Sequence, residues 1–200
     1  MTPTLILLHG WGFDASLWDA LAAALPAYAI ERWDRGYFGT TRAVGAQGPV
    51  VGIGHSLGAM LLADALPAEA PLVAVNGFDH FTGADGVALR VVERMQSRFA
   101  QTPLAVLNEF RAHCGAPAAS AKLDETRLAH DLSLLATHRA APGQRRILSL
   151  QGGLDPILPT CLRGNSFPGA TRATCEEAGH LLPLTHPAWC AGQIEAFLCR

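Results

Sequence analysis

One serine in this chain stands in a sequence that is typical of a catalytic nucleophile. Ser56 lies in Gly54-His55-Ser56-Leu57-Gly58, which follows the apolar run Val50–Ile53 and opens a helical pattern. On a tight turn between a strand and a helix the serine hydroxyl projects outward, and small residues two positions away on either side avoid a steric clash. The motif and its setting predict that Ser56 is a nucleophile.

An aspartate and a histidine later in the chain could activate this serine, whose hydroxyl is a poor nucleophile at neutral pH without a base. Asp155 ends the turn Gln151-Gly152-Gly153-Leu154-Asp155, and His180 follows Ala178-Gly179 just before the last helical pattern. His180 would take the serine proton, while Asp155 would fix the imidazole tautomer and stabilise the imidazolium. A single aspartate in a loop is more often a cap or turn residue. The chain order Ser56, Asp155, His180 nevertheless favours a catalytic triad.

Two backbone amides would complete the site, because the tetrahedral intermediate of such a reaction carries an oxyanion. Leu57, directly after the nucleophile, would supply one amide, and Trp11, in the loop His9-Gly10-Trp11-Gly12, would supply the other. The Trp11 ring would also line the acyl pocket and so bind substrate. The alternative interpretation is that Trp11 is a large core aromatic.

The composition indicates one globular domain. The chain has 200 residues, half of them hydrophobic and 16% charged, and its net charge of −2 gives no general reason to expect a nucleic-acid partner. Its five cysteines are widely spaced and include no C-x-x-C pair, so the spacing suggests no disulfide framework, no metal site and no cofactor. The apolar N-terminal run is far shorter than the ~20 residues of a membrane span. We therefore expect a cytoplasmic protein without a membrane partner, as a monomer or homodimer.

Short apolar runs that end in Gly, Asp or His alternate with helical patterns. Such runs, apolar on both faces, suit strands buried in a parallel sheet, and the alternation predicts an open α/β sheet with helices on both faces. In these sheets ligands bind beyond the carboxyl ends of the strands. The expected strands are Thr4–Leu8, Tyr28–Trp33, Val50–Ile53, Leu72–Val75, Ile147–Leu150 and Ala170–Glu176, and the expected helices are Ala15–Ala24, Leu57–Leu66 and Pro187–Leu198.

The segment 79–144 contains three further amphipathic helix patterns and no strand. The patterns cover Val87–Ala100, Pro103–His113 and Asp124–Thr137, which is more than one crossover between two strands needs. We interpret the segment as a helical cap on a core formed by residues 1–78 and 145–200, within one domain overall. An irregular helical crossover without functional consequence is the alternative.

Together these residues resemble the α/β-hydrolase superfamily over nearly the whole chain. The motifs that match are His9-Gly10-Trp11-Gly12, Asp34-Arg35-Gly36, the Ser56 pentapeptide, the Asp155 turn and Gly179-His180. The opening Leu-Leu-His-Gly-Trp-Gly-Phe-Asp-Ala-Ser-Leu-Trp is similar to the pimeloyl-acyl-carrier-protein methyl ester carboxylesterases of biotin biosynthesis. The segments Arg94-Met95 to Gly115 and Ala74-Val75-Asn76-Gly77 are also similar to those enzymes.

The chain departs from that superfamily in two ways. Family members usually carry two strands before the His-Gly loop, whereas this chain starts at that strand. The helix between the second and third strands is also nearly missing, because only Gly36 to Gly48 are available for it. We therefore predict a trimmed α/β-hydrolase fold of about six mainly parallel strands, with one flank open to substrate or to a second copy.

The resemblance implies a dicarboxylate methyl ester substrate on a phosphopantetheine arm of an acidic carrier protein. An independent feature fits this substrate: Arg90, Arg94 and Arg98 are spaced i, i+4, i+8 and form one stripe on a predicted cap helix. A basic stripe near the entrance would steer an acidic carrier and bind substrate, with Arg111 as an addition. The alternative is a solvated face paired with Glu93 and similar residues.

Other functions stay open at the sequence level. The same triad would serve a general short-chain carboxylesterase or a thioesterase on free small-molecule esters, and it also permits acyl transfer or hydrolysis of a carbon–carbon bond. From another class, the chain could be a non-catalytic binding module with a hydrolase fold. Such modules typically lose a triad member, whereas all three candidates are present here.

Overall fold

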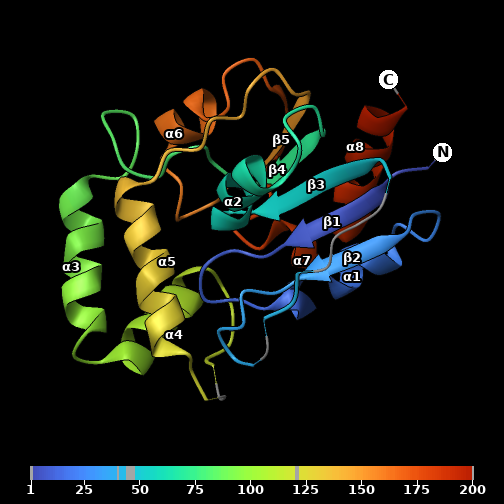
Figure 1. Ribbon diagram of the computed structural model, residues 1–200. Helices are drawn as coiled ribbons and strands as arrows, with labels where there is room; N and C mark the ends of the chain where they lie inside the picture. The colour runs from blue at the N-terminus through green and yellow to red at the C-terminus, as the bar shows by residue number, and fades with distance from the viewer. Residues whose placement is uncertain (1, 40, 44–47, 120–121, 200) are drawn as a thin grey trace.

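The computed structural model describes residues 2–39, 41–43, 48–119 and 122–199. Six strands form one sheet, every neighbouring pair is parallel, and the order is β2-β1-β3-β4-β5-β6 (Figure 1). The prediction of a six-stranded α/β sheet is therefore confirmed. The strands are β1 (Thr4–Leu8), β2 (Ile30–Trp33), β3 (Val50–His55), β4 (Leu72–Val75), β5 (Ile147–Gly152) and β6 (Thr171–Cys175).

Alternate side chains of the strands pack into different hydrophobic clusters. Leu5 and Leu7 of β1 share one cluster with Ile194, whereas Ile6 and Leu8 share another with Leu62. This is the period of two that a strand requires when both faces of its sheet are covered. One face is covered by α2 (Leu57–Ala65), and the other by η1 (Ala15–Trp18), α1 (Asp19–Ala23), α7 (Leu182–Thr185) and α8 (Pro187–Leu198) (Figure 1).

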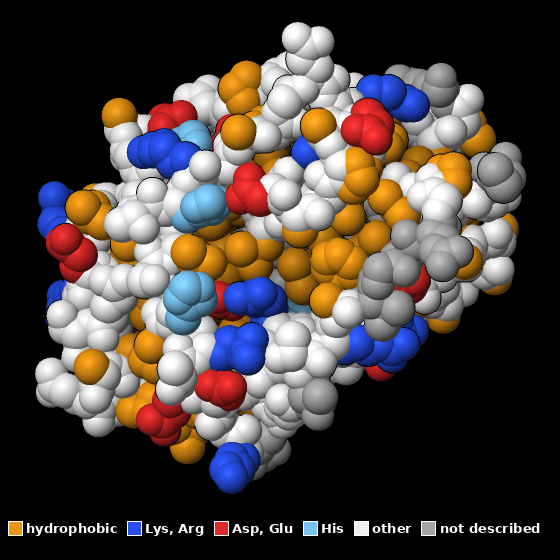
Figure 2. Space-filling view, in the orientation of Figure 1, with side chains coloured by type: hydrophobic (Ala, Val, Ile, Leu, Met, Phe, Trp, Pro, Cys, Tyr) orange, Lys and Arg blue, Asp and Glu red, His pale blue; other side chains and the backbone are white. Residues whose placement is uncertain are grey.

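The connection from β2 to β3 contains no helix among its described residues, as the sequence predicts. Asp34 forms an isolated antiparallel bridge with Arg42, and residues 40 and 44–47 of the predicted gap lie outside the described residues. A cavity of about 380 Å³ lies beside this connection, with Leu8, Trp33 and Leu61 in its wall. Figure 2 shows hydrophobic side chains gathered over the same part of the molecule. The α2 face of the sheet therefore carries less cover than the opposite face.

Three helices lie between β4 and β5 and stand beyond the carboxyl ends of the strands (Figure 1). They occur where the sequence predicts them, and they share one hydrophobic cluster with Trp11 and Leu57, which flank the candidate catalytic residues. The division of the chain into core and cap stays a prediction. The helices are α3 (Leu89–Phe99), α4 (Pro103–His113) and α5 (Glu125–Thr137), and the short α6 (Thr160–Asn165) follows β5.

A buried charged group fastens α5 to the loop after β2. Arg35 donates two hydrogen bonds to the carboxylate of Asp131, at 2.7 and 2.5 Å, and the Tyr37 hydroxyl donates a third at 2.5 Å. Asp131 and Tyr37 are fully buried. Removal of one partner would leave a buried charge without compensation, so this group fixes the helices over the sheet.

Among the described residues, none of the helices combines the length and apolar character that a membrane crossing requires.

Candidate active site

Ser56 occupies a strained turn between β3 and α2. Its φ angle is +52°, in a region that side-chain-bearing residues rarely adopt, and it is the residue before the first turn of α2. Its amide donates to the carbonyl of Val75, at 3.0 Å, so the turn is held to the neighbouring strand β4. Strain of this kind persists only where the surroundings over-determine it, and it is common at functional sites.

The two glycines of the Ser56 pentapeptide are required by backbone contacts. A Cβ atom on Gly54 would lie 2.3 Å from the backbone nitrogen of Ala59, and one on Gly58 would lie 2.1 Å from the carbonyl oxygen of Leu8. Neither backbone atom can move without displacing a strand or a helix. A Cβ atom on Gly10 would lie 2.9 Å from the Cβ of Ser56, so the loop after β1 passes directly beside the nucleophile candidate.

His180 and Asp155 form a buried pair. His180 Nδ1 lies 2.8 Å from Asp155 Oδ2, and both side chains are fully buried. The other carboxylate oxygen accepts hydrogen bonds from the amides of Ile157, at 2.7 Å, and Leu158, at 3.2 Å. Burial alone would raise the pKa of the Asp155 carboxyl. The neighbouring His180 and the two amides outweigh that effect and hold the pKa below its ordinary value.

The second nitrogen of His180 is free to accept a proton. His180 Nε2 is buried and has no hydrogen-bond partner among the described residues. The ring of His55 lies 4.8 Å from the ring of His180, and His55 directly precedes Ser56. The structure thus brings Ser56, Asp155 and His180, which follow β3, β5 and β6, to one edge of the sheet. Catalytic hydrogen bonds are often absent from a free enzyme and form only with substrate.

The two predicted oxyanion donors differ in their surroundings. Leu57 is the first residue of α2, so its amide is one of the helix N–H groups that lack an intrahelical acceptor. The Trp11 ring is buried: its Nε1 donates to the carbonyl of Leu128, at 2.8 Å, and its ring lies edge-on to those of Phe99 and Phe110. The ring therefore packs as a core aromatic between the loop and the helices. The backbone of Trp11 lies in the loop beside Ser56.

Asn76 is a site residue that sequence reasoning did not single out for a role. It is fully buried, has a φ angle of +44°, and follows β4 directly. Its Nδ2 donates to the carbonyls of Gly179, at 3.0 Å, and His180, at 2.8 Å, and its Oδ1 accepts from the amide of Gly152, at 2.8 Å. His55 Nε2 lies 2.9 Å from the same His180 carbonyl. Asn76 therefore holds the backbone of His180 to the ends of β4 and β5.

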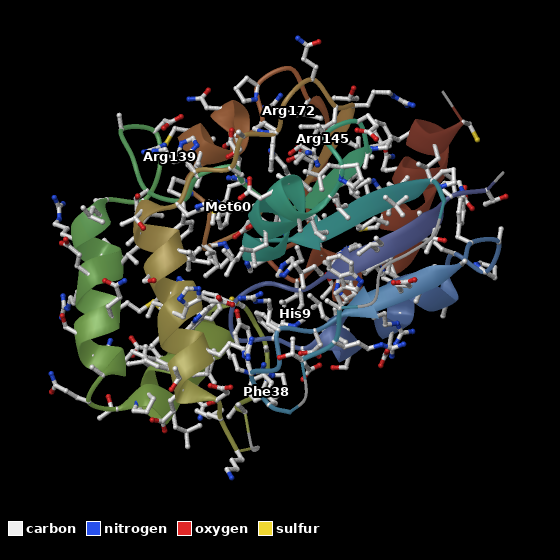
Figure 3. The ribbon with its side chains drawn as sticks, viewed as in Figure 1. His9, Phe38, Met60, Arg139, Arg145 and Arg172 are labelled. Atoms are coloured by element: carbon white, nitrogen blue, oxygen red, sulfur yellow. The ribbon has the colours of Figure 1, made fainter. Side chains whose placement is uncertain are left out.

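His9 fixes the loop that carries Trp11. Its Nδ1 lies 2.9 Å from the carbonyl oxygen of Gly10, and its Nε2 accepts from the amide of Arg35, at 3.0 Å, close to the carboxylate of Asp34. Figure 3 labels His9 beside the carboxyl end of β1. His9 and Asp34 therefore connect the ends of β1 and β2 to the loop beside the nucleophile candidate.

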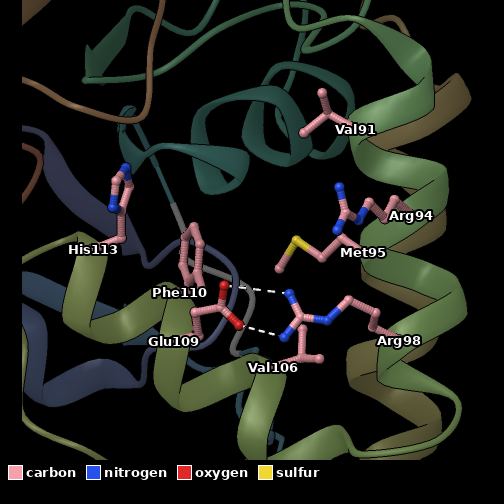
Figure 4. Close-up of a pocket in the computed structure, with 8 residues that line it drawn as sticks. All are labelled: Val91, Arg94, Met95, Arg98, Val106, Glu109, Phe110 and His113. Carbon is pink, nitrogen blue, oxygen red and sulfur yellow. Dashed lines mark hydrogen bonds and ion pairs between the residues drawn. The ribbon is translucent and has the colours of Figure 1, made fainter.

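The four predicted substrate-binding arginines do not act alike. Arg98 forms an exposed ion pair with Glu109 of α4, at 2.5 Å. Arg94 lies beside it, and both line a cavity of about 450 Å³ between α3 and α4, whereas Arg90 is exposed and lies outside that lining (Figure 4). Arg111 donates to the carbonyls of Gly12, at 2.6 Å, and Pro117, at 2.8 Å. Its guanidinium joins α4 to the Trp11 loop rather than to the arginine stripe.

The cavity itself is apolar inside and charged at its rim. Apolar atoms of Val91, Met95, Val106 and Phe110 form its wall, and Arg94, Arg98, Glu109 and His113 provide the charged or titratable groups (Figure 4). The Phe110 ring lies 5.1 Å from that of Trp11 and 6.3 Å from that of Phe13, whose ring in turn lies 5.9 Å from His55. Aromatic side chains therefore stand between this cavity and the residue that precedes Ser56.

Comparison with known proteins identifies the fold. No family model and no curated protein sequence matches the chain. Among solved structures, the chain is similar to an enol-lactonase from Burkholderia xenovorans LB400, with a TM-score of 0.80, 13% identity, and coverage of 100% of this chain and 92% of that one. For an esterase from Exiguobacterium antarcticum the TM-score is 0.79 and the identity 15%, with coverage of 99% of this chain and 92% of that one. For a thermophilic esterase from Thermogutta terrifontis the TM-score is 0.75 and the identity 17%, with coverage of 100% of this chain and 90% of that one.

These likenesses are structural, because the sequence identities lie below one in five. They nevertheless extend over essentially the whole chain. Within this chain, the described residues form a six-stranded parallel sheet with helices on both faces. The chain therefore adopts the α/β-hydrolase fold, in a trimmed form.

Proposed function

We propose that this protein is a serine carboxylesterase that works through an acyl-enzyme. His180 Nε2 takes the proton of Ser56 as Oγ attacks the ester carbonyl, and the amides of Leu57 and Trp11 bind the resulting oxyanion. The imidazolium then gives its proton to the departing alcohol. Water then attacks the acyl-enzyme as His180 removes its proton, and His180 returns that proton to Ser56 Oγ as the acid departs. Asp155 keeps Nδ1 protonated and stabilises the imidazolium throughout.

One observation carries this proposal: the buried His180–Asp155 hydrogen bond of 2.8 Å leaves His180 Nε2 without a partner at the same sheet edge as the strained Ser56. A base that awaits a proton must leave one ring nitrogen unsatisfied. Nδ1 of the buried His55 also lacks a partner among the described residues, but the other nitrogen of His55 faces a backbone carbonyl, whereas that of His180 is held by the Asp155 carboxylate. The similarity to solved esterases adds support through the fold alone. One fold can host several chemistries, so the function is argued from the site residues.

A fluorophosphonate probe tests the proposal directly. The wild type should be labelled stoichiometrically on Ser56, and Ser56→Ala should abolish the labelling. Ser97→Ala, which removes an exposed serine hydroxyl on α3, is the matched control and should label as the wild type does. A well-folded wild type that fails to label would support the non-catalytic binding module instead.

For the substrate, we propose the methyl ester of an acyl chain carried on an acyl carrier protein, in the role that the biotin-biosynthesis esterases have. Support comes from the sequence resemblance and from the arginines on α3. Arg98 is neutralised by Glu109, so Arg90 and Arg94 remain as the exposed cations that would meet an acidic carrier. The alternative is a general short-chain carboxylesterase or thioesterase, which the internal use of Arg111 favours.

Charge reversal distinguishes the two substrates. Arg90→Glu combined with Arg94→Glu should slow hydrolysis of a carrier-bound ester and leave p-nitrophenyl ester hydrolysis unchanged. Arg42→Glu, at an exposed arginine in the β2–β3 connection, is the control and should affect neither. Equal rates of the double variant and the wild type on the carrier-bound ester would favour the general esterase. Growth of a biotin auxotroph that lacks its pimeloyl ester esterase, with wild type and not with Ser56→Ala, would support the carrier-bound ester as substrate, and no growth would favour the general esterase.

A further inference from the structure

A second group of chemically reactive side chains lies outside the Ser56 site. Cys175 ends β6, Glu177 follows two residues later, and His186 stands directly before α8. One potential ligand atom from each residue lies within 4.8 Å of the other two. Cys175 is buried, His186 is half-buried and Glu177 is exposed, so the group reaches from the hydrophobic core to the surface.

The three donor types point to one metal. A thiolate, an imidazole and a carboxylate together select Zn²⁺ over the oxygen-preferring Mg²⁺ and Ca²⁺. Around a tetrahedral Zn²⁺ the donor atoms lie roughly 3.3–3.7 Å apart, given Zn–S near 2.3 Å and Zn–N or Zn–O near 2.0–2.2 Å. The ligand atoms lie within 4.8 Å of one another, and Glu177 is exposed, so its side chain has room to approach a metal. A water molecule would occupy the fourth position.

A neighbouring hydroxyl prepares the histidine. Thr185 Oγ1 donates to the carbonyl of Leu181, at 3.1 Å, and lies 2.9 Å from His186 Nδ1. With the hydroxyl proton directed at the Leu181 carbonyl, His186 Nδ1–H is the donor in the second contact. That tautomer leaves the lone pair of Nε2 available. A hydrogen bond on the opposite ring nitrogen is the usual way in which proteins orient a metal-ligating histidine.

A bound metal ion would change the ionisation of the Cys175 thiol. Burial, with the Glu177 carboxylate nearby, raises the pKa of the Cys175 thiol. A bound Zn²⁺ reverses this balance, because it exchanges the thiol proton for a metal–sulfur bond and releases the proton to solvent. The negative charge of Glu177, which disfavours a free thiolate, then favours the metal complex.

We propose that Cys175, Glu177 and His186 bind one Zn²⁺ ion, which ties together the two ends of the segment that carries His180. The segment leaves β6 at Cys175 and enters α8 after His186, and His180 lies between them. The metal takes no part in ester hydrolysis. The inference does not depend on the esterase proposal, since its test uses no substrate.

Cobalt titration of the full chain, freed of metal with a chelator, tests the site. One equivalent of Co²⁺ should produce a near-ultraviolet thiolate-to-cobalt band, and Zn²⁺ should displace it. Cys175→Ser should remove the band, whereas Cys199→Ser, at an exposed cysteine, should retain it. Absence of the band in the wild type, or its survival in Cys175→Ser, would overturn the proposal.

Two further variants replace the ligands that are not fully buried, so their effects do not depend on a change at the buried Cys175. Glu177→Gln and His186→Ala should each weaken Zn²⁺ binding by at least about tenfold, because even an outer-shell partner is worth 10–100-fold in affinity. His130→Ala, on α5, should bind Zn²⁺ as the wild type does. Zn²⁺ should also slow amide hydrogen exchange across residues 176–186 in the wild type and not in Glu177→Gln. Unchanged exchange in the wild type would refute the tie between the two ends.

Discussion

Replacement of Asn76 should separate the positioning of His180 from the chemistry of the triad. Asn76→Ala removes three hydrogen bonds: one to the carbonyl of Gly179, which is partly buried, and two that are buried, to the carbonyl of His180 and from the amide of Gly152. At about 1 kcal/mol each they account for roughly 3 kcal/mol. An alanine at the φ angle of +44° adds roughly 1–2 kcal/mol. The total, roughly 4–5 kcal/mol, comes close to the stability of a marginal domain, so the variants should be studied at low temperature.

The catalytic effect follows from the same contacts. Once its carbonyl is released, the His180 backbone loses its link to the end of β4, and a displacement of about 1 Å is enough to slow catalysis about 100-fold. Asn76→Gly removes the same hydrogen bonds but tolerates the positive φ angle, so it should be more stable than Asn76→Ala and equally slow. The loss should appear in kcat for a p-nitrophenyl ester, with KM nearly unchanged. A folded Asn76→Gly protein with kcat within twofold of wild type would refute this reasoning. Asn108→Ala, which loses one hydrogen bond far from the triad, is the control.

Three further changes have defined outcomes. Asp155→Asn should keep the fold but reduce kcat by about 10⁴-fold, because the amide favours the wrong imidazole tautomer; a loss smaller than tenfold in steady-state kinetics would exclude Asp155 from the triad. Gly58→Ala should destabilise the protein by about 3 kcal/mol or more in urea unfolding, because its Cβ would meet the Leu8 carbonyl oxygen at 2.1 Å. Gly192→Ala, where a Cβ meets nothing within 4 Å, should instead stabilise α8 by about 0.5–1 kcal/mol; similar destabilisation of both variants would contradict the steric explanation. Burial and the nearby His180 lower the pKa of His55 to about 3, so the unfolded chain binds a proton near pH 6.5 that the folded one does not. Stability is therefore lost as pH falls, by about 2 kcal/mol between pH 6.5 and 5, and His55→Gln should remove that part of the slope; an unchanged slope would argue against a neutral, buried His55.

The strands were predictable because their composition is set by burial on both faces. Leu72–Val75 and Thr4–Leu8 agree with the structure at both ends. The predicted strand ends are wrong where backbone hydrogen bonding to other residues sets the end of a strand. The β3 strand continues to His55 because that residue pairs with Val75 of β4, and such pairing leaves no mark in a single sequence. The expected strand start at Tyr28 is wrong, because the Tyr28 amide bonds to the Leu25 carbonyl, at 3.2 Å, in a turn.

The site residues differ in the same way: some are recognisable from neighbouring residues in the sequence, and others only from contacts with distant parts of the chain. Ser56 was visible because its glycines, two positions away, obey a local steric rule. Asn76 was not, because its three partners lie 76, 103 and 104 residues further along the chain. Arg98 shows the same limit. Helical spacing placed it on a basic stripe, but its partner Glu109 comes from the packing of α3 against α4, which the spacing of one helix does not report.

The trimmed β2–β3 connection leaves the site intact because that site is built from strand ends. The missing helix would have covered the α2 face of the sheet, where Leu8 and Trp33 now border a cavity. The end of β2 still contributes its carboxylate: Asp34 accepts from the amide of Ala15, at 2.8 Å, and lies beside His9 in the loop next to Ser56. The described part of this connection thus borders an apolar cavity on one side of the sheet and contributes Asp34 to the hydrogen bonds at the carboxyl edge. It follows that a substitution on the exposed α2 face should alter stability or association, whereas one at a strand end should alter catalysis.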